Sequence, residues 1–453
     1  MDFIDREKEM QMLEDAMQKK KSMVVLYGRR RVGKTALVKK FIENRDSVYL
    51  YIPLQSEGAM LRYLAETLYR YTGNPLLRSP FSSFRQFMEY LASLDRISVL
   101  DEFQRLERIE GAISILQDIW DSSESMNLIL TGSSMGMIHS LALSGNAPLF
   151  GRRTLDMKLR PFRPDIVFSL AGEVAKGMDF YSVFGGTPAY LQDVQWDHDI
   201  ISNVERLILR KGAPLYSEPE YLIRSETRDA STYLSVLKYI SMGKQRLGDI
   251  SDMLGMERNK VSFYLSVLEN DMDLVRKEVP VTEDQRKSRK GRYVIDDPFF
   301  RFWFRYVFPY ESELEMEKVA EVSEIIRKDL PSHVGMIAEE VVRGYLADEW
   351  PEVGSWWNRS GDEIDIVALN EKKKEILFGE VKWRNRPVGC DVLDELMEKK
   401  DLVQWHNKDR KERFMLVSKS GFTKKCLERM DDEGVIHWDM DDMRKILSSD
   451  GKS

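Results

Sequence analysis

A short segment near the N-terminus carries the residue types that bind nucleotide phosphates. From Gly28 to Thr35 it matches the pattern G-x-x-x-x-G-K-[ST]. Glycines let backbone N–H groups wrap around phosphates, and a helix that begins there adds a favourable dipole. The Lys34 ammonium can reach the β- and γ-phosphates, and the Thr35 hydroxyl can bind Mg²⁺. We therefore expect ATP with Mg²⁺ to be bound by Gly28, Arg29, Arg30, Arg31, Val32, Gly33, Lys34, Thr35 and Ala36.

Polar residues that would complete this site follow two later apolar runs. In "RISVLDEFQRL", Asp101 would hold Mg²⁺ together with Thr35, and Glu102 would polarise the attacking water. The run "MNLILTGSS" ends at Ser133 and Ser134. A serine there can sense the γ-phosphate, and a serine-rich turn is the alternative.

Arg152 and Arg153, in "PLFGRRTLDMKL", could supply an arginine finger, either within the chain or to a neighbouring copy. The alternative is a solvated pair that precedes a strand. The two interpretations are left open by the sequence.

A second set of chemistry-bearing residues lies near the C-terminus. In "ILFGEVKW", Glu380 and Lys382 are two positions apart, so they share one face of an expected strand. Asp365 lies in the upstream run "DEIDIVAL", and the polar "NEKKK" between the two runs predicts a hairpin. Antiparallel pairing would bring Asp365 close to Glu380, and Glu339 lies on a preceding amphipathic helix.

These carboxylates predict a site for Mg²⁺ or Mn²⁺, which prefer oxygen ligands. Glu339, Asp365 and Glu380 would be the ligands. Lys382 would orient or deprotonate a water, or neutralise charge on a phosphate, so that Glu380 and Lys382 are the candidate catalytic pair. The alternative is a solvated strand face.

Basic residues in the middle of the chain suggest double-stranded DNA as a partner. "RLGDISDMLGMERNKVSFYLSVLEN" predicts a helix, a turn at Gly255 and a second helix, followed by two strand-like runs with a basic tip. This pattern predicts a winged helix. The alternatives are an intramolecular clamp or a protein contact. The candidate contacts are Arg258, Asn259, Lys260, Arg286, Lys287, Arg289 and Lys290.

The elements that must position these residues follow from periodicity. Three apolar runs separated by helical patterns predict a parallel sheet covered by helices. The first strand is expected at 23–27, with a helix from about Ala36. In "DDPFFRFWFRYVFPY", Phe299, Phe302 and Tyr306 recur at helical spacing, which predicts a buried helix. Pro331 follows a helical pattern, so we expect a domain boundary at 320–332.

Composition limits the class of protein. The chain has 453 residues, a hydrophobic fraction of 43%, a charged fraction of 32% and a net charge of -7, which predicts several globular domains. Its two cysteines exclude a disulfide scaffold and fit a reducing cytoplasm. We expect no signal peptide and no membrane span.

The phosphate-binding loop is accompanied by the segments "FIDREKEMQML", "LDEFQRL", "ILTGSS", "GRRT" and "FGGTPAYL". Together they resemble the archaeal-type branch of the STAND/AAA+ ATPases over residues 1 to about 220. The resemblance implies that the first segment lies near the adenine. It also implies that Gly186, Thr187 and Pro188 lie in a helical lid, with Pro188 facing the nucleotide. A resting monomer is typical of the family, and a finger acting between copies would require a nucleotide-dependent oligomer.

The C-terminal order of helix-Glu, strand-Asp and strand-Glu-x-Lys resembles the PD-(D/E)xK, or restriction-endonuclease-like, pattern, although Ile364 replaces its proline. Members of the ATPase family commonly carry such a domain. The expected fold is α/β: a P-loop AAA+ three-layer parallel sheet with a helical lid, a winged-helix domain and an α/β nuclease-like domain. The expected segments are 1–165, 166–228, 229–312 and 328–453.

Two functions remain open on the sequence. The first is an ATPase that couples nucleotide state to DNA binding and metal-dependent cleavage. The second is a nucleotide-dependent switch whose C-terminal domain only binds nucleic acid or protein.

Overall fold

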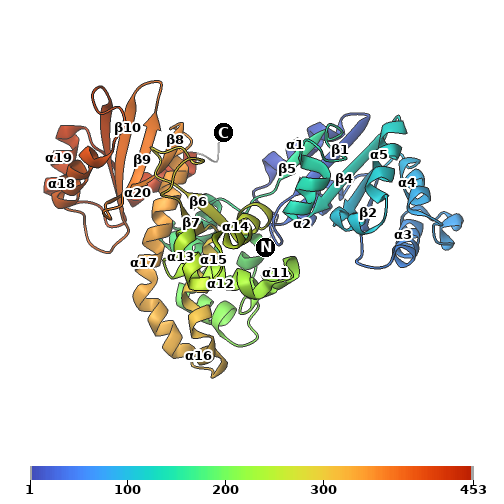
Figure 1. Cartoon of the computed structure of the whole chain (residues 1–453), viewed down its shortest axis with the longest axis horizontal. Coiled ribbons are helices and arrows are strands. Elements are labelled where there is room, and N and C mark those ends of the chain that lie inside the picture. Colours follow the sequence, from blue (N-terminus) through green and yellow to red (C-terminus); the bar gives the residue numbers. More distant parts are fainter. Residues whose placement is uncertain (1–2, 450–453) are drawn as a thin grey trace. The chain divides into compact units, whose positions relative to one another are not determined.

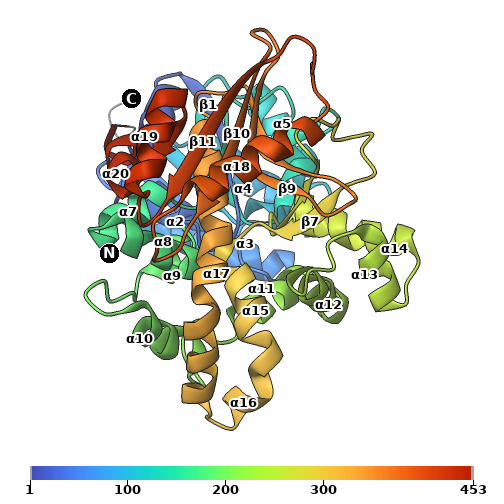
Figure 2. The same cartoon turned by 90° about the vertical axis from the view of Figure 1, so that its left-hand side faces the viewer.

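The computed structural model describes residues 3–449, which form two compact units. The first unit contains the chain up to Pro161 together with residues 187–192 and 270–273. The second unit contains the rest of the described chain. Many elements of both units are labelled in Figure 1, and Figure 2 shows them from a second direction. The four segments expected from the sequence stay predictions at this level.

The first unit is built on a five-stranded sheet whose strand order is β2-β3-β4-β1-β5. Every neighbouring pair is parallel, so the expected parallel sheet is confirmed. In β1 five consecutive residues are buried, as expected of a strand covered on both faces. The strands are β1 (Lys21–Tyr27), β2 (Ser47–Tyr51), β3 (Ile97–Asp101), β4 (Met126–Gly132) and β5 (Leu155–Lys158).

Helices cover both faces of this sheet (Figure 1). One core joins α1 and α2 to alternate residues of the strands, including Val24 and Leu26. The other core joins α3, α4 and α5 to the intervening residues, including Met23 and Val25. The first unit is therefore a three-layer α/β/α structure. The helices are α1 (Glu7–Met17), α2 (Lys34–Ile42), α3 (Glu57–Thr72), α4 (Phe84–Ala92), α5 (Ala112–Ser122), α6 (Met135–Ile138) and α9 (Pro188–Leu191).

The N-terminal part of the second unit is mainly helical. The expected buried aromatic helix is present as α15, in which Phe299, Phe302 and Tyr306 are all buried. Strands β6 (Val275–Glu278) and β7 (Arg292–Ile295) pair antiparallel and follow three helices. The helices are α7 (Pro164–Ala171), α8 (Val174–Phe184), α10 (Ile200–Val204), α11 (Glu218–Glu226), α12 (Ala230–Ser241), α13 (Leu247–Leu254), α14 (Arg258–Ser266), α15 (Pro298–Tyr306) and α16 (Glu311–Glu315).

The domain boundary expected at 320–332 falls within a continuous helix and stays a prediction. Helix α17 runs without interruption from Val319 to Leu346, with Pro331 inside it. A proline removes one intrahelical hydrogen bond but leaves the turns on either side intact. Buried residues before and after it, including Ile326, Leu330 and Val334, pack this helix along its length. Packing therefore outweighs the local preference of Pro331.

The C-terminal part of the second unit is a second five-stranded sheet, with strand order β12-β11-β10-β9-β8. The expected hairpin is formed by β9 and β10, which pair antiparallel with Gly379 opposite Ile366. Helices α18 and α19 share a core with the sheet, and α17 contacts β8, β9 and β10. The elements are β8 (Glu352–Trp357), β9 (Glu363–Asn370), β10 (Glu375–Lys382), α18 (Cys390–Lys399), β11 (Lys411–Ser418), α19 (Lys424–Glu433), β12 (Ile436–Trp438) and α20 (Met440–Ser449).

None of the helices within residues 3–449 combines the length and the apolar character needed to cross a membrane.

Candidate functional site

The loop between β1 and α2 has the backbone conformation of a phosphate-binding turn. Gly28 has a φ of +148° and Gly33 a φ of +98°, both in the region that favours glycine. A Cβ on Gly28 would lie 2.3 Å from the Leu159 carbonyl oxygen, so no larger residue fits. Helix α2 begins at Lys34. Lys34 and Thr35 therefore lie in its first turn, where backbone N–H groups are free to bind anions.

Lys34, Thr35 and Asp101 come together at the end of the sheet that carries this loop. The Lys34 ammonium is buried and donates to the carbonyl oxygens of Gly28 at 2.7 Å and Arg29 at 2.9 Å. The Thr35 hydroxyl lies 3.2 Å from a carboxylate oxygen of Asp101, which also accepts from the Tyr49 hydroxyl. A hydroxyl beside a carboxylate is an oxygen pair that suits Mg²⁺. The residues present therefore fit a magnesium nucleotide.

Glu102 occupies a strained position next to Asp101. Its φ is +60°, which is uncommon for a residue with a side chain and often marks a functional site. Its carboxylate accepts from the Gln104 amide at 2.7 Å, and the Ser133 hydroxyl lies 3.5 Å away. Because β4 lies between β1 and β3, Ser133 is brought beside Glu102 from a third strand. The sequence did not indicate Gln104, since its role depends on this backbone conformation.

Pro188 lies against the phosphate-binding loop. A Cβ built on Gly33 would be 3.9 Å from the Pro188 ring, and Arg29 donates to the buried Thr187 hydroxyl at 3.3 Å. Residues 187–192 belong to the same compact unit as the loop. The Thr187–Pro188 segment is therefore positioned to respond to a ligand at Gly33.

Arg152 and Arg153 are not brought to this loop. Both precede β5, which pairs parallel with β1 from Val24 onward, whereas the loop follows the opposite end of β1. Arg152 forms a bidentate pair with Asp121 at 2.7 and 2.8 Å, and Arg153 pairs with Asp156. These pairs engage both arginines in the described chain, and their role as an arginine finger, within the chain or between copies, stays a prediction.

The basic residues of the middle region are mostly exposed. Arg258, Asn259 and Lys260 are exposed on the first turn of α14. In the segment between β6 and β7 the exposed basic residues are Arg286, Lys287 and Arg289. Lys290 is instead half-buried and pairs with Glu283 at 2.5 Å.

The four predicted residues of the C-terminal site lie in or beside one cavity. This cavity has a volume of about 490 Å³ and is lined by Glu339, Asp365 and Glu380. Lys382 donates to Glu380 at 2.5 Å, and the backbone N–H of Val381 donates to the Asp365 carboxylate at 3.0 Å. The hairpin thus places Asp365 and Glu380 side by side, and α17 brings Glu339.

Burial and repulsion between carboxylates shift the pKa values of the residues in this cavity. Burial, with the nearby Asp365 carboxylate, raises the pKa of Glu339 to about 9. Burial also raises the pKa of Asp365 and of Glu380. The pKa of Lys382 is raised because the Glu380 carboxylate outweighs the effect of burial. Crowded carboxylates with raised pKa values are typical of functional sites and of sites that bind cations.

Two further lining residues were not indicated by the sequence. Arg343 donates to the Asp365 backbone oxygen at 2.7 Å, and Lys399 contributes from α18. Arg343 lies one helical turn after Glu339, at 4.0 Å. This i to i+4 spacing on one helix was the sequence feature that could have predicted Arg343 as a neighbour of Glu339.

The carboxylates fit a divalent ion only in part. Within residues 3–449 no three Cys, His, Asp or Glu side chains are arranged to hold a metal ion together. However, one carboxylate oxygen of Glu380 is buried and has no hydrogen-bond partner in the described chain. Such an orphaned buried oxygen is energetically costly unless a ligand binds it. These carboxylates are therefore chemically suited to Mg²⁺ or Mn²⁺, but their side chains do not point to one common position in this structure.

Comparison with known families defines the class of the first unit. A family described as "ATPase domain predominantly from Archaea" matches residues 3–194. A second family, described as "Archaea bacterial proteins of unknown function", matches residues 303–400. Together with the loop geometry, the first match identifies an ATP-binding P-loop ATPase domain of archaeal type.

Individual relatives match different shares of the chain. The uncharacterized protein MJECL04 of Methanocaldococcus jannaschii is 32% identical over 408 residues, covering 84% of this chain and 88% of that protein. The uncharacterized ATP-binding protein MJ0423 of the same organism is 50% identical over 44 residues, covering 10% of this chain and 75% of that protein. The Walker-type ATPase paby2304 of Pyrococcus abyssi is 20% identical, with a TM-score of 0.49, covering 67% of this chain and 96% of that chain. The chain belongs to the same family as protein MJECL04.

Proposed function

We propose that this chain is a STAND-type ATPase whose nucleotide state controls a nucleic-acid-binding and metal-dependent nuclease-like region. The observation that carries the nucleotide part is the contact of Thr35 with Asp101 at 3.2 Å beside the buried Lys34. Bound Mg²⁺ would neutralise charge on the phosphates. Lys34 holds the phosphates, and Glu102 orients a water whose position Ser133 and Gln104 help to fix.

Helices α12 to α14 and the β6–β7 hairpin support a winged-helix role in DNA binding. The order of three helices and an antiparallel hairpin is that of a winged helix. The start of α14 presents Arg258 and Lys260 to solvent, and the hairpin tip presents Arg286. Contacts of this kind to phosphates would make binding fall with salt.

The C-terminal part of the proposal rests on one cavity that gathers Glu339, Asp365 and Glu380, with Lys382 paired to Glu380. A divalent ion bound there would lower the pKa of a water and neutralise charge on a phosphodiester. The chain's own contribution is positional. The hairpin fixes two carboxylates on one face, and Lys382 is placed to stabilise the phosphate oxygens.

The test is cleavage of labelled linear, supercoiled and branched DNA by the full chain with Mg²⁺ or Mn²⁺. Wild type is compared with Glu380→Ala and with Glu375→Gln, a control on the same strand outside the cavity, where Glu375 pairs with Arg413. The proposal predicts that cleavage is lost in Glu380→Ala, by at least about 100-fold, and kept in Glu375→Gln. Equal cleavage by wild type and Glu380→Ala, or none by either, would contradict a nuclease role.

A second candidate is a nucleotide-dependent switch in which the C-terminal region binds without cleaving. It is favoured by the ion pair between Lys382 and Glu380 at 2.5 Å, which occupies one carboxylate oxygen. On this account Glu380→Ala leaves the biological function intact, whereas Lys34→Ala abolishes it. The reverse pattern would exclude this candidate.

A further inference from the structure

A second cavity in the second unit lies outside the sites described above. Its volume is about 330 Å³, near the lower limit of ligand pockets. It is formed by α8, the start of α10, the first half of α17 and the segments that follow β10 and β11. Its size therefore suits a ligand about as large as a mononucleotide.

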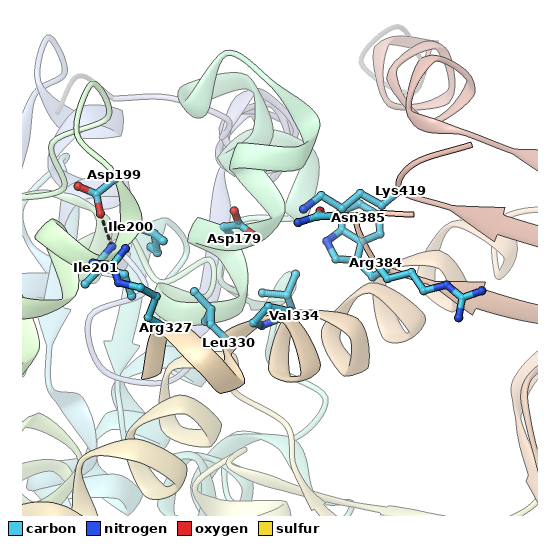
Figure 3. A pocket seen from close by; sticks show the side chains of 12 residues that line it. Asp179, Asp199, Ile200, Ile201, Arg327, Leu330, Val334, Arg384, Asn385 and Lys419 are labelled. Carbon is cyan, nitrogen blue, oxygen red and sulfur yellow. Dashed lines mark hydrogen bonds between the residues drawn. The ribbon is translucent and has the colours of Figure 1, made fainter. Parts of the chain in front are cut away.

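One end of this cavity holds the Asp179 carboxylate and the Lys419 ammonium, which lie close enough for the ammonium to oppose the rise in the carboxyl pKa. Figure 3 shows Lys419 and Asn385 extending toward Asp179, while Arg384 turns away from the cavity. Within the described chain, no hydrogen bond or ion pair engages the carboxylate of Asp179 or the ammonium of Lys419. Half-buried charges are normally paired. At this end the carboxylate can accept hydrogen bonds from a ligand and the ammonium can donate one to it.

The walls between the two ends are mainly apolar. Leu330 and Val334 of α17 are buried, and Ile200 and Ile201 face them from the start of α10 (Figure 3). Trp383 also lines the cavity, and its buried indole N–H has no hydrogen-bond partner in the part of the chain that the structure describes. A flat apolar group with polar edges fits such walls.

The opposite end carries Arg327 beside Asp199 (Figure 3). Asp199 is already engaged, because its carboxylate accepts from the backbone N–H groups of Ile201 and Ser202 at 3.0 and 3.1 Å. Arg327 is exposed; among the described residues it has a loose contact with Glu324, at 3.9 Å, and its charge helps to lower the pKa of Asp199. Its guanidinium is therefore available to a phosphate, which it can bind with two hydrogen bonds.

We propose that this cavity binds a guanine mononucleotide, with the base at Asp179 and the phosphate at Arg327. The base edge of guanine presents an oxygen acceptor beside two N–H donors. A carboxylate accepts from both donors, and Lys419 or Asn385 donates to the oxygen. Adenine presents only one donor on that edge and gives a poorer match to the carboxylate.

The charge state of Asp179 is compatible with this role. Burial raises its pKa to about 6, an effect opposed by the Lys419 ammonium and reinforced by Glu173. At pH 7.5 the carboxylate is therefore ionised and accepts from the base.

The test is isothermal titration of the full chain with GMP, IMP, AMP, UMP and XMP at pH 7.5, in wild type and in Lys34→Ala. The variant Lys34→Ala removes nucleotide binding at the phosphate loop, so any heat of binding that remains comes from the cavity. The proposal predicts that GMP binds best, that IMP is weaker because it lacks the 2-amino donor, and that Lys34→Ala has no effect on GMP affinity. Binding of GMP that disappears in Lys34→Ala, or equal affinity for GMP and AMP, would overturn it.

The variant Asp179→Asn provides a second test, because a change in base preference cannot result from loss of folding. Its amide can donate to the 2-oxo group of xanthine, so this variant should gain affinity for XMP while losing roughly 10- to 100-fold for GMP. Asp193→Asn changes an exposed carboxylate outside the cavity and should leave the GMP affinity unchanged. A loss of GMP binding without a gain of XMP binding, or an equal loss in Asp193→Asn, would contradict the assignment.

Discussion

Thr35 and Asp101 are separated by 66 positions, and their side chains lie 3.2 Å apart. Their types and spacing predicted a shared role, because Thr35 follows the loop after β1 and Asp101 ends β3, and the carboxyl ends of parallel strands lie at the same end of the sheet. Gln104 and Tyr49 could not be predicted in the same way. Their contacts depend on the positive φ of Glu102 and on β2 pairing with β3, neither of which leaves a local signal.

The residue His333 shows how a buried titratable group affects stability. Its ring is fully buried in α17 and its Nε2 lies 2.8 Å from the Ser182 carbonyl oxygen. Burial lowers its pKa from 6.5 to about 3. The unfolded chain therefore binds a proton below pH 6.5 that the folded chain does not, so stability is present above that pH and is lost as the pH falls.

We predict that wild type loses roughly 2 to 3 kcal/mol of this contribution between pH 7 and pH 4.5, and that His333→Gln does not. The glutamine amide can still donate to Ser182. The measurement is urea unfolding at both pH values, with exposed His198→Gln as the control. An identical loss in wild type and His333→Gln would show that this histidine does not titrate on unfolding.

Among the helices and strands, the sequence was most informative where the periodicity of apolar residues was compatible with a single type of element. The buried run of β1, the hairpin of β9 and β10 and the aromatic helix α15 all follow from periodicity. Two features depend on packing between distant residues and have no local sequence signal. Helix α17 continues through Pro331, and Arg152 is held by Asp121 of α5 at the edge of the sheet away from the phosphate loop.

Helix α17 provides a prediction at this scale. A proline inside a helix lacks an N–H group and costs about 3 kcal/mol relative to alanine in an unstrained host. We expect Pro331→Ala to stabilise the chain by roughly 1 to 3 kcal/mol, measured by thermal or urea unfolding. Pro298→Ala is the matched control, because Pro298 lies at the start of α15, where proline is tolerated. No gain in Pro331→Ala would mean that tertiary packing already requires the local distortion.

At the scale of the whole molecule, the chain returns to the first compact unit twice after leaving it. Residues 187–192 place Pro188 beside Gly33, and residues 270–273 place Asp273 beside Lys158, at 2.8 Å. Lys158 ends β5, whose next residue, Leu159, contacts Gly28. Both returns therefore touch the surroundings of the phosphate loop. They are continuous in sequence with the helices and the hairpin of the second unit.

We propose that nucleotide binding at the first unit controls the C-terminal site. The most direct measurement is cleavage of labelled DNA with Mg²⁺ or Mn²⁺, with and without ATP, by wild type, Lys34→Ala and Glu102→Gln. Lys40→Ala, an exposed lysine of α2 paired with Glu43, is the control. Loss of Glu102 should slow ATP hydrolysis on the order of 100-fold or more while nucleotide binding is kept.

We predict ATP-dependent cleavage by wild type and Lys40→Ala, sustained cleavage by Glu102→Gln, and little cleavage by Lys34→Ala. Cleavage by Lys34→Ala that equals wild type, with or without ATP, would contradict the claim that the nucleotide site controls the C-terminal one.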